Sequence, residues 1–197
     1  MNKLIVSLVA GMLLGACASG PQGPEAARFD LGAVGAPMAP ALPLKSLDVQ
    51  GESWLAGSAM HYRLNYADPL RRQAYVESRW AAPPGELLES LLKRRFGAAG
   101  EGTGCRLQLA LDEFEQRFED AQRSQLVLEV RASLLPARGG DALARRSFRS
   151  EKPATSADAR GGAAAAREAA LALGDEIGNW LGGLAREKPA LVERCRN

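Results

Sequence analysis

Histidine is nearly absent from this 197-residue chain, and its scarcity limits the chemistry that the chain can perform. The single histidine, His61, lies on a predicted strand and shares one face with Arg63 and Asn65, which favours a solvated strand residue over a catalytic base. Downstream of residue 17 there is no Gly-x-Ser-x-Gly nucleophile motif and no cysteine–histidine cluster with metal-ligand spacing. We therefore expect neither an enzyme nor a protein that holds a metal or another cofactor.

An excess of charge of either sign is also missing. The chain carries 25 Lys and Arg against 23 Asp and Glu, a net charge of +2, and nothing in this balance indicates binding to nucleic acid. An acidic segment, residues 112–115, lies on a predicted strand, which sends neighbouring carboxylates to opposite faces. This arrangement suits general acid–base chemistry poorly, and we expect a solvated face instead.

The apolar run at the N-terminus, Leu4 to Leu14, is shorter than the roughly 20 residues that a membrane-spanning helix needs. Lys3 precedes the run and Gly15-Ala16 follows it, which is typical of a signal peptide. Cys17 comes next, and the stretch resembles the lipobox of bacterial lipoproteins. This resemblance implies cleavage after residue 16, a diacylglyceryl group on the Cys17 sulfur and an acyl chain on its amine. The alternative is an ordinary secretory signal with an incidental cysteine.

The sequence divides into three parts. Residues 1–16 form the expected signal peptide, residues 17–27 a flexible tether rich in Gly, Pro and Ala, and residues 28–197 a single domain. Ala18 and Ser19 follow the lipidation site, whereas an Asp there often retains lipoproteins at the inner membrane. We therefore expect the periplasmic side of the outer membrane, with the inner membrane as the alternative.

Cysteine is scarce as well, with Cys105 and Cys195 the only two besides Cys17. In an oxidising compartment these two could pair as a disulfide that ties a central strand to the C-terminal tail. The alternative is two free thiols that lie too far apart to bond.

Alternating and helical patterns predict an α+β fold: a mostly antiparallel or mixed sheet of about five strands with two amphipathic helices packed on one face. One helix opens at Pro83-Pro84 and ends at Gly97. The other follows a capping box formed by Thr155 and Asp158, and its Ala/Gly-rich early turns suit close packing on the sheet. A contact between subunits is the alternative for this helix, and it would make the protein a homo-oligomer. The segments with strand patterns are 28–31, 44–50, 60–66, 73–80, 105–111, 126–132 and 143–149. A bulge or bend is expected near residue 112.

Several segments together resemble the ABC-type transport auxiliary lipoproteins, the PqiC-like group. They are WLAG at 54–57, MHYRLNYADP at 60–69, AYVESRWAAPPGELL at 74–88, DEFEQRF at 112–118, RASL at 131–134, Phe148 and the Ala/Gly stretch 159–172. The resemblance implies a sheet backed by helices in a periplasm-facing lipoprotein that works with an ABC ATPase, a permease and an MCE-domain protein. Such systems are thought to move lipids or other hydrophobic molecules between the inner and outer membranes. The cysteine pair is not a hallmark of the family.

A role in attachment and docking directs attention to aromatic and Arg side chains, which are enriched at interface hot spots. The candidate interface residues are Trp54, Tyr62, Arg63, Tyr66, Tyr75, Arg79 and Trp80. The alternative is that these aromatics fill the core under the helices. The alternative function is that of a lipoprotein that regulates envelope assembly or cell-wall synthesis.

Overall fold

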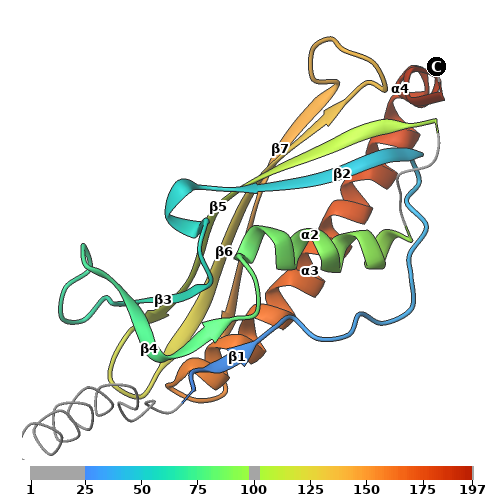
Figure 1. Cartoon of the computed structure of the whole chain (residues 1–197). Coiled ribbons are helices and arrows are strands. Elements are labelled where there is room, and N and C mark those ends of the chain that lie inside the picture. Colours follow the sequence, from blue (N-terminus) through green and yellow to red (C-terminus); the bar gives the residue numbers. More distant parts are fainter. Residues whose placement is uncertain (1–24, 98–102, 197) are drawn as a thin grey trace, which may run out of the picture.

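The computed structural model describes residues 25–97 and 103–196. The predicted signal peptide, Cys17 and most of the predicted tether therefore lie outside the described residues. The described chain forms a mixed sheet of seven strands with three α-helices and one short 3-10 helix (Figure 1). The strands are β1 (Ala27–Phe29), β2 (Leu44–Gly51), β3 (Ala59–Leu64), β4 (Arg72–Trp80), β5 (Cys105–Phe118), β6 (Ser124–Leu135) and β7 (Ala144–Pro153). The helices are η1 (Ser53–Leu55), α2 (Pro84–Phe96), α3 (Ala159–Glu187) and α4 (Pro189–Arg196).

The α+β class is confirmed, but the sheet has seven strands instead of about five, and α4 adds a third helix. The order is β1-β4-β3-β5-β6-β7, and β2 pairs with β5 off this path. Strand β2 runs parallel to the first half of β5, from Leu44 to Gly51, while β3 runs parallel to its last three residues. Two short strands thus share one edge of one long strand, an arrangement that alternation in the sequence does not reveal.

Strand β5 carries the predicted bulge. Its register against β6 shifts between Leu111 and Glu113, so the buried set changes from odd to even residue numbers there. Pairing with β6 continues beyond the bulge to Phe118, so the strand is longer than the alternating segment 105–111. The bulge therefore lets one strand keep an apolar face toward the helices along its full length.

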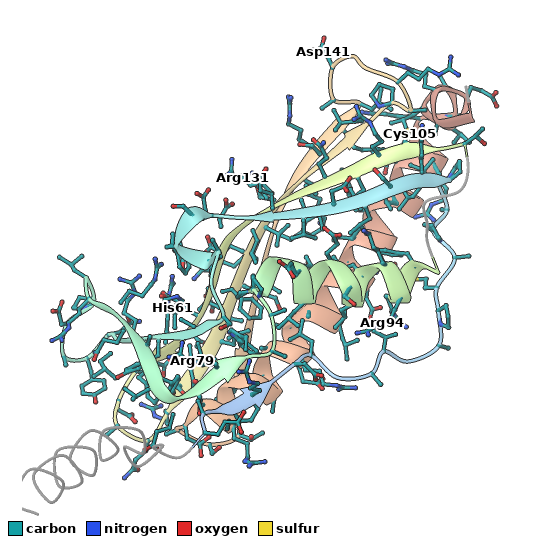
Figure 2. The ribbon with its side chains drawn as sticks, in the orientation of Figure 1. His61, Arg79, Arg94, Cys105, Arg131 and Asp141 are labelled. Carbon is teal, nitrogen blue, oxygen red and sulfur yellow. A yellow bond between two sulfur atoms is a disulfide. The ribbon has the colours of Figure 1, made fainter. Side chains whose placement is uncertain are left out.

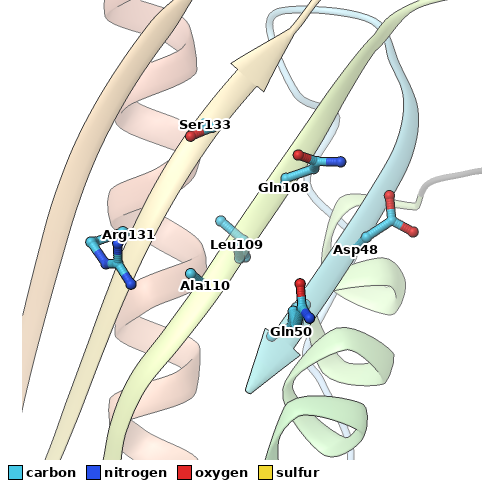
Figure 3. A pocket seen from close by; sticks show the side chains of 8 residues that line it. Asp48, Gln50, Gln108, Leu109, Ala110, Arg131 and Ser133 are labelled. Carbon is cyan, nitrogen blue, oxygen red and sulfur yellow. The ribbon is translucent and has the colours of Figure 1, made fainter. Parts of the chain in front are cut away.

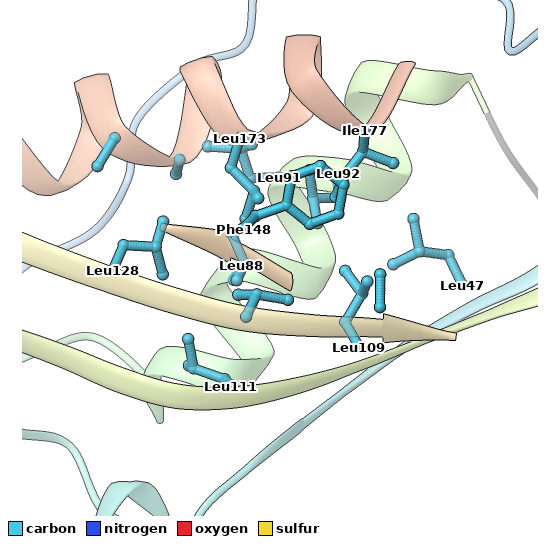
Figure 4. Close-up of a cluster of buried hydrophobic side chains, with 14 of the residues drawn as sticks. Leu47, Leu88, Leu91, Leu92, Leu109, Leu111, Leu128, Phe148, Leu173 and Ile177 are labelled. Atoms are coloured by element: carbon cyan, nitrogen blue, oxygen red, sulfur yellow. The ribbon is translucent and has the colours of Figure 1, made fainter. Parts of the chain in front are cut away.

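Helices α2 and α3 both cover the same face of the sheet, as predicted (Figure 1). Helix α2 contacts β2, and α3 contacts β6 and β7. The core between them is built mainly from leucine (Figure 4). Labelled there are Leu88, Leu91 and Leu92 from α2, Leu173 and Ile177 from α3, and Leu47, Leu109, Leu111, Leu128 and Phe148 from the sheet.

The ends of these helices follow local chemistry. Helix α2 begins at Pro84 and ends before Gly97, whose φ of 56° is the left-handed conformation that glycine adopts without strain. Helix α3 begins after Asp158, whose carboxylate accepts a hydrogen bond from the Gly161 N–H at 2.8 Å. The predicted capping box is therefore wrong, because Asp158 itself is the N-cap and Thr155 lies outside the helix.

The Ala/Gly-rich first turns of α3 lie close to the sheet. A Cβ at Gly162 would overlap the side-chain oxygen of Gln116 on β5, so any larger residue here would require the Gln116 side chain to move. At the other end of the molecule, a disulfide joins Cys105 at the start of β5 to Cys195 in α4. The sheet is thus held to its helices at both ends, by close packing at one and by a covalent bond at the other.

Candidate functional site

The face of the sheet that α2 and α3 leave uncovered, called here the helix-free face, carries the polar side chains of β5, β6 and β7. Strand alternation sends Leu128, Val130 and Ala132 toward the helices, and Glu129, Arg131 and Ser133 away from them. One face of the sheet is therefore sealed into the core, and the other is open to solvent or to a partner.

Three adjoining hollows lie on this face and share Arg131. The first has a volume of about 280 Å³ and is shown in Figure 3, where the labelled polar side chains stand in front of the strands, while Leu109 belongs to the core on the side of the helices behind. The other two, about 380 and 330 Å³, extend over β6 and β7. We call this region the Arg131 trough. It is lined by Asp48, Gln50, Gln108, Ala110, Asp112, Glu129, Arg131, Ser133, Arg145, Ser147 and Arg149.

Most charges in the trough are paired across strands. Arg131 of β6 binds Asp112 of β5 with a closest distance of 2.6 Å, through two nitrogens that each donate to one carboxylate oxygen. Arg149 of β7 pairs with Glu129 and with Glu151. These pairs fix the side chains in a mixed pattern of charge, which is suited to recognition of a complementary polar surface.

Next to the trough lies a buried carboxylate. Glu115 of β5 has no exposed side-chain area, and three arginine guanidinium groups surround it. Arg63 of β3 and Arg72 of β4 each lie 3.0 Å from a carboxylate oxygen, and Arg117 lies 2.7 Å away. Arg72 also pairs with Glu113 at 3.1 Å. We call these residues the Glu115 cluster.

Burial alone would raise the pKa of Glu115, but hydrogen bonds from Arg63, Arg117 and Arg72 outweigh it and hold the pKa below its usual range. The carboxylate is therefore ionised, and it joins three strands through charge-assisted bonds. The prediction that residues 112–115 form a solvated face is wrong for Glu115. The Glu115 side chain is buried because the bulge at residue 112 changes the face to which it points and because arginines of the β3–β4 hairpin, far away in the sequence, pack against it.

His61 is half-buried beside the Glu115 cluster, which corrects the prediction of a solvated strand residue. The His61 ring contacts the Trp54 ring edge-on, with the two ring centroids 5.6 Å apart. The Arg72 guanidinium stacks on the Trp54 ring, 3.3 Å from its centroid. Burial and then the positive charge of Arg72 lower the pKa of His61. The imidazole is therefore neutral at neutral pH, and the contacts describe a packing role.

The predicted interface residues separate into three groups. Trp80 lies in the core against Phe114, as the alternative interpretation held, while the hydroxyls of Tyr62 and Tyr75 bond to Gln73 and Gln116 on the helix side. Burial raises the pKa of Tyr75. Trp54 and Arg63 lie on the helix-free face, where Trp54 stacks against Arg72 and Arg63 pairs with Glu115. Tyr66 and Arg79 are exposed. The set is therefore not one surface.

Sequence reasoning missed Glu115, Arg72, Arg117 and Arg131. A signal was present, because Glu113, Glu115 and Arg117 recur with a period of two after the bulge and so share one face. The pairing of that face with Arg63 and Arg72 depends on contacts 43 to 52 residues apart, which the pattern of one strand does not contain.

Comparison with known proteins assigns the family. The model of the ABC-type transport auxiliary lipoprotein component family matches residues 61–178. The chain belongs to this family. The match runs from β3 into α3, so it includes the Glu115 cluster and most of the trough. As an ABC-type transport auxiliary lipoprotein, the protein has a transport-associated role in the cell envelope, as the membrane-anchored lipoprotein component of an ABC system.

Solved structures share the fold of this auxiliary lipoprotein. A DUF330-family protein from Xanthomonas campestris is 20% identical, with a TM-score of 0.70 over 83% of this chain and 100% of that chain. A second structure, titled only as an uncharacterized protein, is 14% identical, with a TM-score of 0.61 over 80% and 99% of the two chains. No curated protein matches the sequence. Among the described residues, no helix is both long enough and apolar enough to span a membrane.

Proposed function

We propose that this protein is the lipid-anchored docking component of an ABC/MCE-type system that moves lipids or other hydrophobic molecules between the inner and outer membranes. In this proposal acyl chains on Cys17 hold the protein on the periplasmic side of the outer membrane. The protein catalyses no reaction and needs no cofactor, and it acts by binding an MCE-domain partner in the periplasm. The observation that carries the proposal is the Arg131 trough, a broad polar surface on a sheet whose other face is sealed by helices.

The chemistry of the trough favours a protein surface as its ligand. Its hollows are shallow and lined by charged, amide and small side chains, whereas a site for acyl chains would be apolar and enclosed. The cargo is therefore expected to pass through the partner. Within the described residues Arg145 is exposed and has no ion-pair partner, which leaves its charge available for an acidic group across the interface.

Substitutions in the trough test this proposal. Ser147 is exposed and lines two of the hollows, so Ser147→Trp fills the trough without changing charge, and Arg145→Glu reverses its unpaired charge. Arg138→Glu, in the exposed β6–β7 loop, is the matched control outside the trough. We expect both trough variants to lose in-cell crosslinking to the MCE protein and to make the outer membrane sensitive to detergent. The control should behave as the wild type.

Two results would contradict the proposal. One is retention of the crosslink by both trough variants at normal protein levels. The other is wild-type protein that captures a cell-wall synthase or another envelope-assembly enzyme instead of an MCE protein, which would favour the regulatory alternative. Mass spectrometry of the native N-terminus and fractionation of the two membranes test the lipidation of Cys17 and the location independently of docking.

A further inference from the structure

The β3–β4 hairpin carries unusual apolar exposure. Leu70 is 91% exposed, Val76 84% and Tyr66 52%, and these are all the exposed large hydrophobic residues in the described parts of the chain. Single exposed apolar residues are ordinary, but here all three belong to one hairpin. Elsewhere in the described parts of the chain the large apolar side chains are buried or half-buried, so this hairpin stands out as a contact element.

The tip of the hairpin, residues 65–71, is ordered by its own hydrogen bonds. The Ala67 and Asp68 N–H groups donate to the Leu64 carbonyl at 3.0 and 2.8 Å, and the Leu70 N–H donates to the Asp68 carboxylate at 3.1 Å. Arg63 donates to the Pro69 carbonyl at 2.9 Å. Because these backbone groups are already paired, the turn can enter a less polar environment at reduced cost, with the Leu70 side chain pointing outward.

The tip lies at one end of the long axis of the molecule. Leu64 pairs with Phe118, the last residue of β5, and the Asn65 N–H donates to the Phe118 carbonyl, so residues 65–71 project beyond the end of that strand (Figure 1). Cys105 begins the same strand, and its 14 residues span about 45 Å at roughly 3.3 Å each. The disulfide and the loop with Asp141 are at the opposite end (Figure 2).

The described chain starts at residue 25, just ahead of strand β1. Strand β1 pairs in parallel with β4, Ala27 with Ser78, and β4 itself begins at Arg72 next to the tip. Because the pairing is parallel, the chain approaches Ala27 from the direction of Arg72. Cys17 precedes Ala27 by ten residues, a span of at most about 35 Å. The lipidation site can therefore reach the membrane at this end of the molecule.

We propose that the tip of the β3–β4 hairpin rests in the lipid surface that holds the Cys17 anchor. Leu70 enters the boundary between headgroups and acyl chains, Tyr66 lies at the level of the headgroups, and the exposed Arg71 reaches the phosphates. The inference rests on the proposed lipidation of Cys17. The hairpin and the anchor together orient the domain, with its disulfide end directed away from the bilayer.

A single fluorescent label tests the contact. In the lipidated full-length protein Cys17 is acylated and the other two cysteines are bonded to each other, so Leu70→Cys supplies the one free thiol for an environment-sensitive dye. Asp141→Cys, also exposed, is the control at the opposite end. Both proteins are reconstituted in vesicles of phosphatidylethanolamine and phosphatidylglycerol, with or without brominated acyl chains. We expect a blue shift and quenching by bromine at residue 70, and aqueous emission at residue 141.

The outcomes separate the two claims. If the protein floats with the vesicles but the label at residue 70 keeps its aqueous emission, the hairpin contact is overturned and the anchor stands. If the protein does not float, the anchoring and the hairpin contact are both overturned. If the label becomes shielded only when the MCE partner is added, the hairpin binds protein, and the membrane assignment is wrong.

Discussion

Removal of the disulfide between Cys105 and Cys195 should lower the stability of the domain by an amount that follows from the length of the loop that the bond closes. Cys105 and Cys195 are fully buried, so replacing both with alanine removes the bond without burying a hydroxyl group. The bond closes a loop with a sequence separation of 90 residues. In the chain-entropy model such a loop restricts the unfolded state by about 15 cal/mol/K, or about 4.6 kcal/mol at 25 °C. The unfolding entropy of a domain of about 170 residues is roughly 0.36 kcal/mol/K, so we expect the melting temperature to fall by about 13 °C.

Circular dichroism during thermal and urea unfolding measures this effect in the wild type, the double-alanine variant and the reduced wild type. The variant and the reduced protein should melt close together, because both remove the same constraint from the unfolded chain. The urea m-value should rise slightly, since the unlinked chain exposes more surface when it unfolds. A fall of less than about 3 °C, or two reactive thiols in the native wild type, would refute the reasoning.

Three further predictions concern the sheet and its contact with α3. Glu115→Gln should cost about 3–5 kcal/mol in urea unfolding, because it removes the buried carboxylate that pairs with three half-buried arginines, whereas Glu113→Gln, at a partly exposed carboxylate, should cost less. The folded pKa of Glu115 lies below its unfolded value near 4.5, so its stabilisation is complete above that pH and is lost as the pH falls through the folded pKa. The wild type should therefore lose more stability than Glu115→Gln in acid titration below about pH 4.5, and parallel curves would contradict this. Gly162→Ala should destabilise by about 1–3 kcal/mol in thermal melts through overlap with Gln116, whereas Gly183→Ala, with no neighbour within 4 Å of its Cβ position, should be neutral or stabilising.

The helix-free face shows where sequence reasoning reached its limit. The alternation of apolar and polar residues correctly predicted the β3–β4 hairpin and strands β6 and β7, and it located the bulge near residue 112. It could not show that β2 and β3 share one edge of β5, because parallel pairing depends on crossovers between distant segments. Seven segments had strand patterns, but the sheet was expected to contain only about five strands, and Glu115 was assigned to a solvated face.

The sequence by itself determined the properties that depend on near neighbours: the α+β class, the start of α2 at Pro84 and its end at Gly97, the amphipathic face of each helix, and the family resemblance. The tertiary structure alone decided which charges meet. Arg63 and Arg72 surround Glu115 across 43 to 52 residues of chain, and Arg131 reaches Asp112 from the next strand. Local conformation follows from interactions within a few residues, whereas these sites depend on register between strands that only the packed core brings together.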